Sequence, residues 1–178
     1  MKKQILLLAG SPRKNGNSDT LCNSFKKGCE EQGHQVQKIY LQDQHIQGCT
    51  ACYACKKLGH CILKDDAAEV QRAMIQADVI VLASPVYFYS ISGQLKTLID
   101  RCLSCAAKLS GKDFYFLLTA ADSKEEMKRA ADALTGFTDC ISGSRVKGIV
   151  YGDGAWQLGD IQGHPALEEA YQLGKQIQ

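Results

Sequence analysis

The chain has 178 residues, 45% of them hydrophobic, and a formal net charge of +2. This length suits one domain, and the even charge balance excludes the basic footprint of a nucleic-acid binder and the acidic excess of a disordered chain. No apolar run is long enough to cross a membrane, and Met1-Lys2-Lys3 leads into a run too short for a signal peptide. We therefore expect a single domain over residues 1–178, located in the cytoplasm, without a nucleic-acid or membrane partner.

Five strands are expected along the chain, each followed by a helix. Continuous apolar runs at residues 5–9, 79–83 and 114–118 indicate strands buried on both faces of a parallel sheet. The mixed segments 35–41 and 145–151 suit the edges of that sheet. Apolar residues recur at helical spacing within residues 21–29, 67–77, 95–103, 127–134 and 167–177. This alternation predicts an α/β fold with a doubly wound five-stranded parallel sheet of strand order 2-1-3-4-5, the flavodoxin-like arrangement.

The segment between the first strand and the first helix has the composition of an anion site. It reads Gly10-Ser11-Pro12-Arg13-Lys14-Asn15-Gly16-Asn17-Ser18-Asp19-Thr20. A helix N-terminus presents unpaired backbone N–H groups and the positive end of the helix dipole, and hydroxyl, amide and guanidinium groups can add bonds to a phosphate. We interpret the segment as a phosphate loop in which Asn17 or Ser18 caps the helix. A polar loop before an ordinary capped helix is the alternative.

The phosphate loop lacks two common nucleotide fingerprints. No Gly-Lys-Ser/Thr closes it, and it contains no Gly-x-Gly-x-x-Gly. These absences disfavour a nucleoside triphosphatase and a Rossmann dehydrogenase.

A second loop, residues 84–93, follows the third strand and is rich in aromatic residues. In the predicted strand order it faces the phosphate loop across the switch point of the sheet, where ligands of doubly wound folds bind. Tyr87, Phe88 and Tyr89 can form a flat, partly apolar bed for a planar heterocycle. Any one of these rings can instead pack against its own helix, but three cannot easily do so together.

Four cysteines are clustered in the connection after the second strand. Cys49, Cys52, Cys55 and Cys61 have two-residue and five-residue spacings that let thiolates converge, which suits a [4Fe–4S] cluster or, less comfortably, a zinc ion. A loop of oxidisable thiols without metal is the third reading. Asp65-Asp66 is expected to cap the following helix. The other cysteines, Cys22, Cys29, Cys102, Cys105 and Cys140, are expected to be buried thiols.

Several motifs together resemble those of the NAD(P)H-dependent FMN reductases, and most nearly the iron-sulfur flavoprotein branch. They are Gly10 to Arg13, Asn17 to Leu21, the cysteine block, Asp65-Asp66, Ser84 to Tyr87, and Gly93 to Arg101. The resemblance implies FMN, with its phosphate on Ser11, Arg13, Asn17, Ser18 and Thr20. It implies that the flavin ring lies on Pro85, Val86, Tyr87, Phe88 and Tyr89, and topology adds Thr119 and Ala120 at the edge of the ring.

The resemblance also implies the reaction. NAD(P)H would give a hydride to the flavin, and the electrons would pass to a quinone, a second flavin, an electron-transfer protein or a bound cluster. No acid–base constellation is expected, because the flavin itself carries the chemistry. The alternatives are a ferredoxin-linked iron-sulfur flavoprotein that reduces oxygen species, and a non-enzymatic flavodoxin-like electron carrier. A homodimer or tetramer is expected.

Overall fold

The computed structural model describes all 178 residues and contains the expected parallel sheet. Its strands are β1 (Gln4–Ala9), β2 (Gln35–Tyr40), β3 (Val79–Tyr87), β5 (Asp113–Thr119) and β6 (Arg145–Gly152). They lie in the order β2-β1-β3-β5-β6, and every neighbouring pair is parallel. The predicted fold and strand order are therefore confirmed. One short strand was not expected: β4 (Ser90–Ile91) pairs with the end of β3 as an antiparallel hairpin.

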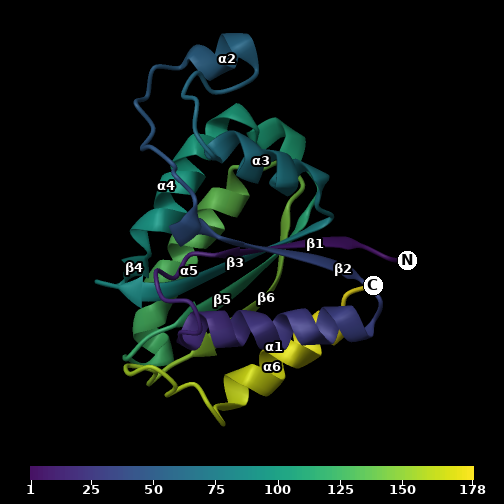
Figure 1. Ribbon diagram of the computed structural model, residues 1–178, viewed down its shortest axis with the longest axis vertical. Coiled ribbons are helices and arrows are strands. Elements are labelled where there is room, and N and C mark those ends of the chain that lie inside the picture. Colours follow the sequence, from purple (N-terminus) through teal and green to yellow (C-terminus); the bar gives the residue numbers. More distant parts are fainter.

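The helices cover both faces of the sheet (Figure 1). One face carries α1 (Asn17–Glu31) and α6 (Pro165–Lys175), and the other carries α3 (Ala67–Gln76), α4 (Gly93–Arg101) and α5 (Lys124–Asp139). The helical pattern expected over residues 95–103 ends in a 3₁₀ turn, Cys102–Ser104, whereas the sequence did not indicate α2 (Ala54–Leu58) or the 3₁₀ turns Leu41–Asp43 and Ala106–Leu109. None of the helices combines the length and the apolar character that crossing a membrane requires.

Alternation along the buried strands creates two cores. In β1, Leu6 and Leu8 point into the core under α3, α4 and α5, whereas Ile5 and Leu7 point into the core under α1 and α6. Because both faces are covered, the strand reads as a continuous apolar run. Four of the five cysteines outside the cysteine block are buried as expected, but Cys140, just after α5, is exposed, so that expectation was wrong.

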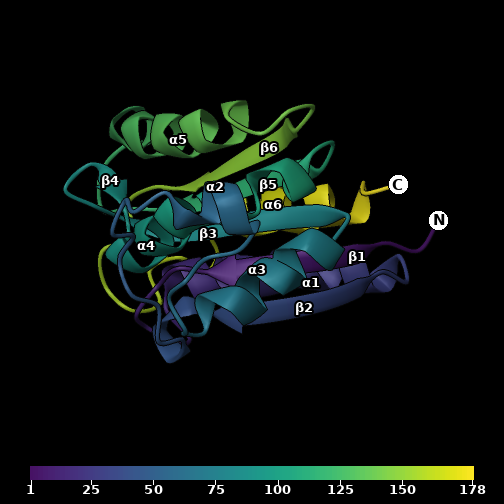
Figure 2. The same ribbon diagram turned by 90° about the horizontal axis from the view of Figure 1, so that it is seen from above.

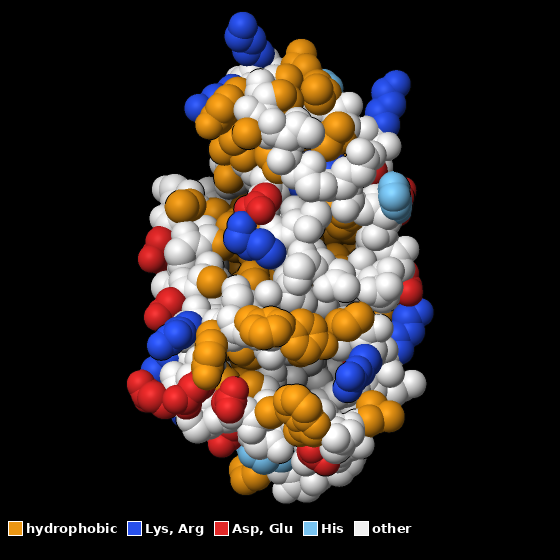
Figure 3. All heavy atoms as spheres, turned by 90° about the vertical axis from the view of Figure 1, so that its left-hand side faces the viewer, with side chains coloured by type: hydrophobic (Ala, Val, Ile, Leu, Met, Phe, Trp, Pro, Cys, Tyr) orange, Lys and Arg blue, Asp and Glu red, His pale blue; other side chains and the backbone are white.

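The loops that follow the parallel strands meet at one edge of the sheet. Figure 2 shows the strands side by side from β2 to β6, so their carboxyl ends form a single rim. The connection that carries α2 leaves this frame and projects outward past α3 and α4, on the side of that helix layer away from the sheet (Figure 1). On the rim side, hydrophobic side chains form a band across the middle and a second group over the α2 segment (Figure 3).

Candidate functional site

A cavity of about 740 Å³ opens at the carboxyl ends of β1, β3, β5 and β6, and we call it the strand-end cavity. From the phosphate loop it is lined by Ser11, Arg13 and Asn17. From the second loop it is lined by Pro85, Val86, Tyr87, Phe88 and Tyr89, and from the loop after β5 by Thr119 and Ala120. The structure thus brings ten of the twelve expected cofactor-site residues to one cavity. Ser18 and Thr20 do not line it.

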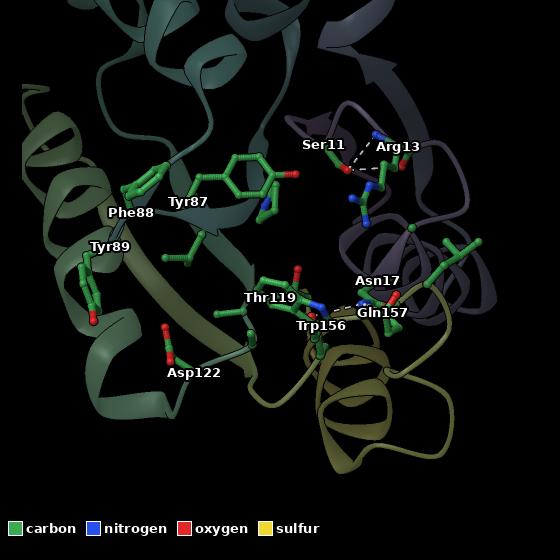
Figure 4. Close-up of a pocket in the computed structure, with 17 residues that line it drawn as sticks. Ser11, Arg13, Asn17, Tyr87, Phe88, Tyr89, Thr119, Asp122, Trp156 and Gln157 are labelled. Atoms are coloured by element: carbon green, nitrogen blue, oxygen red, sulfur yellow. Dashed lines mark hydrogen bonds between the residues drawn. The ribbon is translucent and has the colours of Figure 1, made fainter.

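Backbone geometry sets the shape of the phosphate loop. A Cβ at Gly10 would lie 2.8 Å from Ser92 Oγ and 2.9 Å from Ala83 O, so only glycine lets the chain leave β1 so close to β3. The Ser11 hydroxyl then accepts from the Arg13 N–H at 3.1 Å and closes a tight turn. The Arg13 side chain is exposed and lies on the opposite side of the cavity from Phe88 and Tyr89 (Figure 4).

The start of α1 differs in detail from the expectation. Gly16, not Asn17 or Ser18, is the N-cap residue, and no side chain bonds the first helical N–H groups. The Asn17 amide is used elsewhere, because its Nδ2 donates to Gln157 O at 2.8 Å and its Oδ1 accepts from Gly159 N at 3.1 Å. The helix therefore keeps free backbone donors at the cavity, while Asn17 holds the loop after β6.

The hydroxyls of Ser18 and Thr20 are engaged inside the protein. Ser18 is buried and its Oγ lies 2.7 Å from Thr119 Oγ1, which ties α1 to the end of β5. Thr20 Oγ1 donates to Gly16 O at 3.1 Å. These two residues therefore support the loop from behind.

A buried carboxylate supports the phosphate loop from the other side. Asp19 accepts from the backbone N–H of Asn15 at 2.8 Å, where the chain has a left-handed φ of 60°, and it also forms an ion pair with Lys38. The Tyr40 hydroxyl donates to the same carboxylate at 3.2 Å. Because this pair is buried and neutral overall, it holds the loop without placing free negative charge at the cavity.

The aromatic loop is a strained hairpin. Val86 pairs with Ile91 and Tyr87 with Ser90, so Phe88 and Tyr89 occupy a two-residue turn. Both have left-handed φ values, 49° and 60°, at positions that usually take Asn and Gly. Each residue in this conformation lowers the stability of the fold by about 1 to 3 kcal/mol, and such strain clusters at active sites and ligand-binding segments. The strain turns the Phe88 ring fully into solvent at the mouth of the cavity (Figure 4).

The loop after β6 is a part of the cavity wall that the sequence reading missed. Ala155, Trp156, Gln157 and Leu158 line the cavity, and the Ala155 N–H donates to Ala120 O at 2.7 Å. Asp122, which follows β5, also lines it. The lone tryptophan of the chain, in a glycine-rich loop directly after a strand, was the signal that could have identified this wall.

A separate cavity of about 350 Å³, the cysteine cavity, lies between the α2 segment and the end of α4. All four expected ligands, Cys49, Cys52, Cys55 and Cys61, line it. No three histidine, cysteine or acidic side chains in the chain are arranged to hold one metal ion. The pKa of Cys52 is lowered, first by the backbone N–H of Ala54 and then by the Thr50 hydroxyl. These thiols share one hollow without a preformed single-ion site.

A buried ion pair forms the floor of the cysteine cavity. Arg101 contacts Asp65 through two bonds, from NH1 to Oδ2 at 2.7 Å and from NH2 to Oδ1 at 3.1 Å. Burial alone would raise the pKa of Asp65, but Arg101 and the backbone N–H groups of Gln47 and Ala67 outweigh it and lower the pKa. The bond to Ala67, the first residue of α3, agrees with the expected capping role, whereas the Asp66 carboxylate accepts from the His45 N–H.

Comparison with known proteins agrees with this geometry. An iron-sulfur flavoprotein of Archaeoglobus fulgidus is 38% identical over 96 residues, which cover 54% of this chain and 44% of that protein. YwqN of Bacillus subtilis, assigned by name to the NAD(P)H-dependent FMN-containing oxidoreductases, is 26% identical over 97% of both chains. The solved NAD(P)H:quinone oxidoreductase of Methanothermobacter marburgensis has a TM-score of 0.76 at 16% identity, covers 98% of this chain and 96% of its own, and shows the shared fold.

The family of the chain follows from a match that covers most of its length. The alignments to the iron-sulfur flavoproteins span only about half of those proteins, for example 44% of one and 51% of another. In contrast, the family model described as NADPH-dependent FMN reductase matches residues 3–157. FMN and a nicotinamide co-substrate, both expected from the sequence, are the cofactors of this family. The resemblance is confirmed, and the chain belongs to the NADPH-dependent FMN reductase family.

Proposed function

We propose that the chain is an FMN-dependent NAD(P)H oxidoreductase that works in the strand-end cavity. The observation that carries this proposal is the combination, in one cavity, of a helix N-terminus with free backbone donors and a strained aromatic hairpin. The first suits a phosphate and the second suits a flat heterocycle. A flavin mononucleotide has both parts.

The phosphate end would be built by the loop after β1. The N–H groups at the start of α1 and the exposed guanidinium of Arg13 face the cavity, so they can bind a phosphate dianion. The neighbouring Lys14 is instead paired with Asp43 at 2.7 Å. Arg13 is therefore the cation that we assign to the phosphate.

The ring end would be built by the loops after β3, β5 and β6. Pro85 and Val86 form the part of the wall that continues β3, Tyr87 stands over it, and Trp156 closes the opposite side (Figure 4). Bound FMN would accept a hydride from a nicotinamide and pass the electrons to a second acceptor. The task of these residues is to stack the two rings and to exclude water, which requires no acid or base.

We propose that the cysteine cavity binds a [4Fe–4S] cluster. The lining residues fit such a cluster, because they include four cysteine thiols. Asp100 is the one acidic residue among them. In such a cluster each thiolate binds a different iron, so its ligands need not converge on one point, which agrees with the absence of a preformed single-ion site. When bound, the cluster would supply one-electron transfer to an acceptor such as a ferredoxin-type protein or a quinone.

The exposed aromatics at the mouth of the strand-end cavity favour a symmetric assembly. Phe88, Trp156 and Leu158 all carry large exposed apolar side chains around one opening. Apolar patches of this kind on soluble proteins commonly mark contact surfaces. We propose a homodimer or tetramer that covers them, and sedimentation of the flavin-loaded protein would disprove this by showing a monomer at micromolar concentration.

The experiment that tests the function is an anaerobic purification followed by reduction. The isolated protein should contain FMN, and NADPH or NADH should bleach its visible flavin absorption and support steady turnover with a quinone. A protein that binds FMN but shows no reduction by either nicotinamide would be an electron carrier. Iron, sulfide and zinc analysis of the same sample tests the assignment of the cysteine cavity separately.

A further inference from the structure

Arg101 lies under the cysteine cavity, and both of its terminal nitrogens form hydrogen bonds within the protein. It is 2% exposed, and its two terminal nitrogens bond the Asp65 carboxylate, while NH1 also donates to Gln47 O at 2.7 Å. Gln47 precedes the cysteine block by two residues and Asp65 follows it by four. One guanidinium therefore holds both ends of the segment that carries the four cysteines.

The third nitrogen of this guanidinium, Nε, has no hydrogen-bond partner. Arg101 Nε is the only buried side-chain nitrogen or oxygen in the structure without a hydrogen-bond partner. An unpaired buried donor of this kind destabilises the folded protein and normally finds a partner. The charge of Arg101 is already balanced by Asp65, so what the Nε–H lacks is an acceptor nearby.

The acceptor that we assign to this N–H group is the sulfur of Cys61. Cys61 and Arg101 both line the cysteine cavity and also the smaller hollow beside it, which none of the other three cysteines of the cysteine block lines. The pKa of Arg101 is raised chiefly by Asp65, and Cys61 contributes in the same direction.

We propose that Arg101 is a positioning residue for Cys61, donating its spare Nε–H to the Cys61 sulfur and so coupling the fourth cysteine to the buried Asp65 ion pair. This inference deepens the proposed role of the cysteine cavity, and its consequence for iron rests on that role. A hydrogen bond to a ligand sulfur holds the ligand in place and raises the reduction potential of the centre, because it withdraws charge from the sulfur.

The test compares two conservative changes in the anaerobically purified, flavin-loaded protein. Arg101→Lys keeps a cation beside Asp65 but removes the Nε–H and the two-bond contact with that carboxylate, so a double-mutant cycle with Cys61 separates the two losses. The matched control is Arg72→Lys, because Arg72 is exposed and lines the neighbouring hollow but not the cysteine cavity. For Arg101→Lys we expect iron to be lost to a ferrous chelator about 10 to 100 times faster than from the wild type, and the midpoint potential of the centre to shift to a more negative value. Arg72→Lys should match the wild type in both. Equal iron loss and equal potential in Arg101→Lys and the wild type would overturn the proposal.

A double-mutant cycle tests the contact whether or not iron binds. Urea unfolding of Arg101→Lys, Cys61→Ala and the double variant should be non-additive, with Cys61→Ala less costly in the Arg101→Lys background. The same cycle with Cys49→Ala should be additive, because Cys49 lines the cysteine cavity but not the smaller hollow that Cys61 and Arg101 share. Additive behaviour of both cycles overturns the contact. Iron-free wild-type protein with a non-additive Cys61 cycle would retain the contact and remove only the cluster.

A second comparison tests the proposal without the Arg101 variant. If Arg101→Lys fails to fold, Cys61→Ala and Cys49→Ala are compared alone by thermal unfolding. Cys61→Ala should have the lower midpoint, because it leaves the buried Nε–H without any acceptor. Equal midpoints would contradict the proposal.

Discussion

The strand-end cavity and the cysteine cavity differ in how the chain builds them. The strand-end cavity is formed by loops that follow four strands of one sheet. Hydrogen bonds such as Ser18 to Thr119 and Asn17 to Gln157 hold these loops together. The cysteine cavity belongs mainly to one excursion of the chain, anchored by the Asp65–Arg101 pair. The first should therefore tolerate the loss of single contacts, whereas the second should depend on one ion pair.

The largest expected effect comes from breaking that pair. Asp65→Asn leaves the buried Arg101 charge without its partner, which costs about 3 to 5 kcal/mol of unfolding free energy. Asp66→Asn is the matched control, because Asp66 only accepts one backbone N–H. Urea unfolding of both variants measures the difference. Similar midpoints for the two variants would show that the cysteine segment is anchored elsewhere.

The same pair gives a pH dependence with a defined sign. The pKa of Asp65 is lower in the folded protein than in the unfolded chain, so the carboxylate binds fewer protons when folded and its stabilisation is fully present above the unfolded value of about 3.9. That contribution is lost as the pH falls through the folded pKa. Asp65→Asn should therefore show a shallower loss of stability between neutral and acidic pH than the wild type. An unchanged slope in urea unfolding across this range would contradict the assignment.

The next effect concerns the phosphate end of the strand-end cavity. Arg13→Ala removes a charge-assisted bond worth roughly 1.5 to 3 kcal/mol, so the FMN dissociation constant should rise about ten-fold or more. Lys14→Ala changes the adjacent cation, which is held by Asp43, and should leave FMN affinity nearly unchanged. Fluorescence titration with FMN measures both. If the two variants lose affinity equally, the loop acts through overall charge and Arg13 has no specific contact.

A smaller effect separates the two cavities by their aromatic residues. Trp156 lines the strand-end cavity and Tyr53 the cysteine cavity, and both are largely exposed. An aromatic stacking contact is worth about 0.5 to 1.5 kcal/mol, so Trp156→Ala should weaken FMN or nicotinamide binding by roughly two-fold to ten-fold. Tyr53→Ala should leave both constants unchanged. Titrations that show the reverse pattern would mean that the flavin ring lies elsewhere.

The smallest effect should be a gain of stability. Phe88 is fully exposed and has a left-handed φ of 49°, so Phe88→Asn should relieve strain without removing packing. We expect about 1 kcal/mol of added stability by thermal unfolding. Phe88→Ala removes the same ring but keeps the strain, so its stability should stay near that of the wild type. If both substitutions stabilise equally, the exposed ring and not the backbone is the source of the cost.

The sequence predicted the parts of the molecule that depend on periodicity and strand order. Apolar runs such as residues 79–83 identified the buried strands, and the expected switch point of the sheet placed the two main loops opposite each other. The roles of individual side chains were less accessible. Ser18 has the composition of a phosphate ligand, yet its hydroxyl is taken by Thr119, which lies 101 residues away in the chain.

The same limit applies to Trp156 and Arg101. Trp156 belongs to the cavity only because the loop after β6 folds back onto Ala120. Asp65 and Arg101 are 36 residues apart in the chain, and tertiary packing brings them together. Their ion pair therefore could not be predicted from the sequence. Local pattern thus predicted the frame, whereas contacts between distant segments decided which side chains face a ligand.

The most direct test of the account is a single-turnover reduction that compares the two cavities. Cys52→Ser changes a thiol of the cysteine cavity and touches nothing in the strand-end cavity. In anaerobic stopped-flow mixing with NADPH, or with NADH, the FMN absorption of this variant should bleach at the wild-type rate, while electron delivery to a one-electron acceptor such as a cytochrome falls. Loss of flavin bleaching in a folded, FMN-loaded Cys52→Ser protein would show that the cysteine loop shapes the flavin site, and it would contradict the separation of the two cavities.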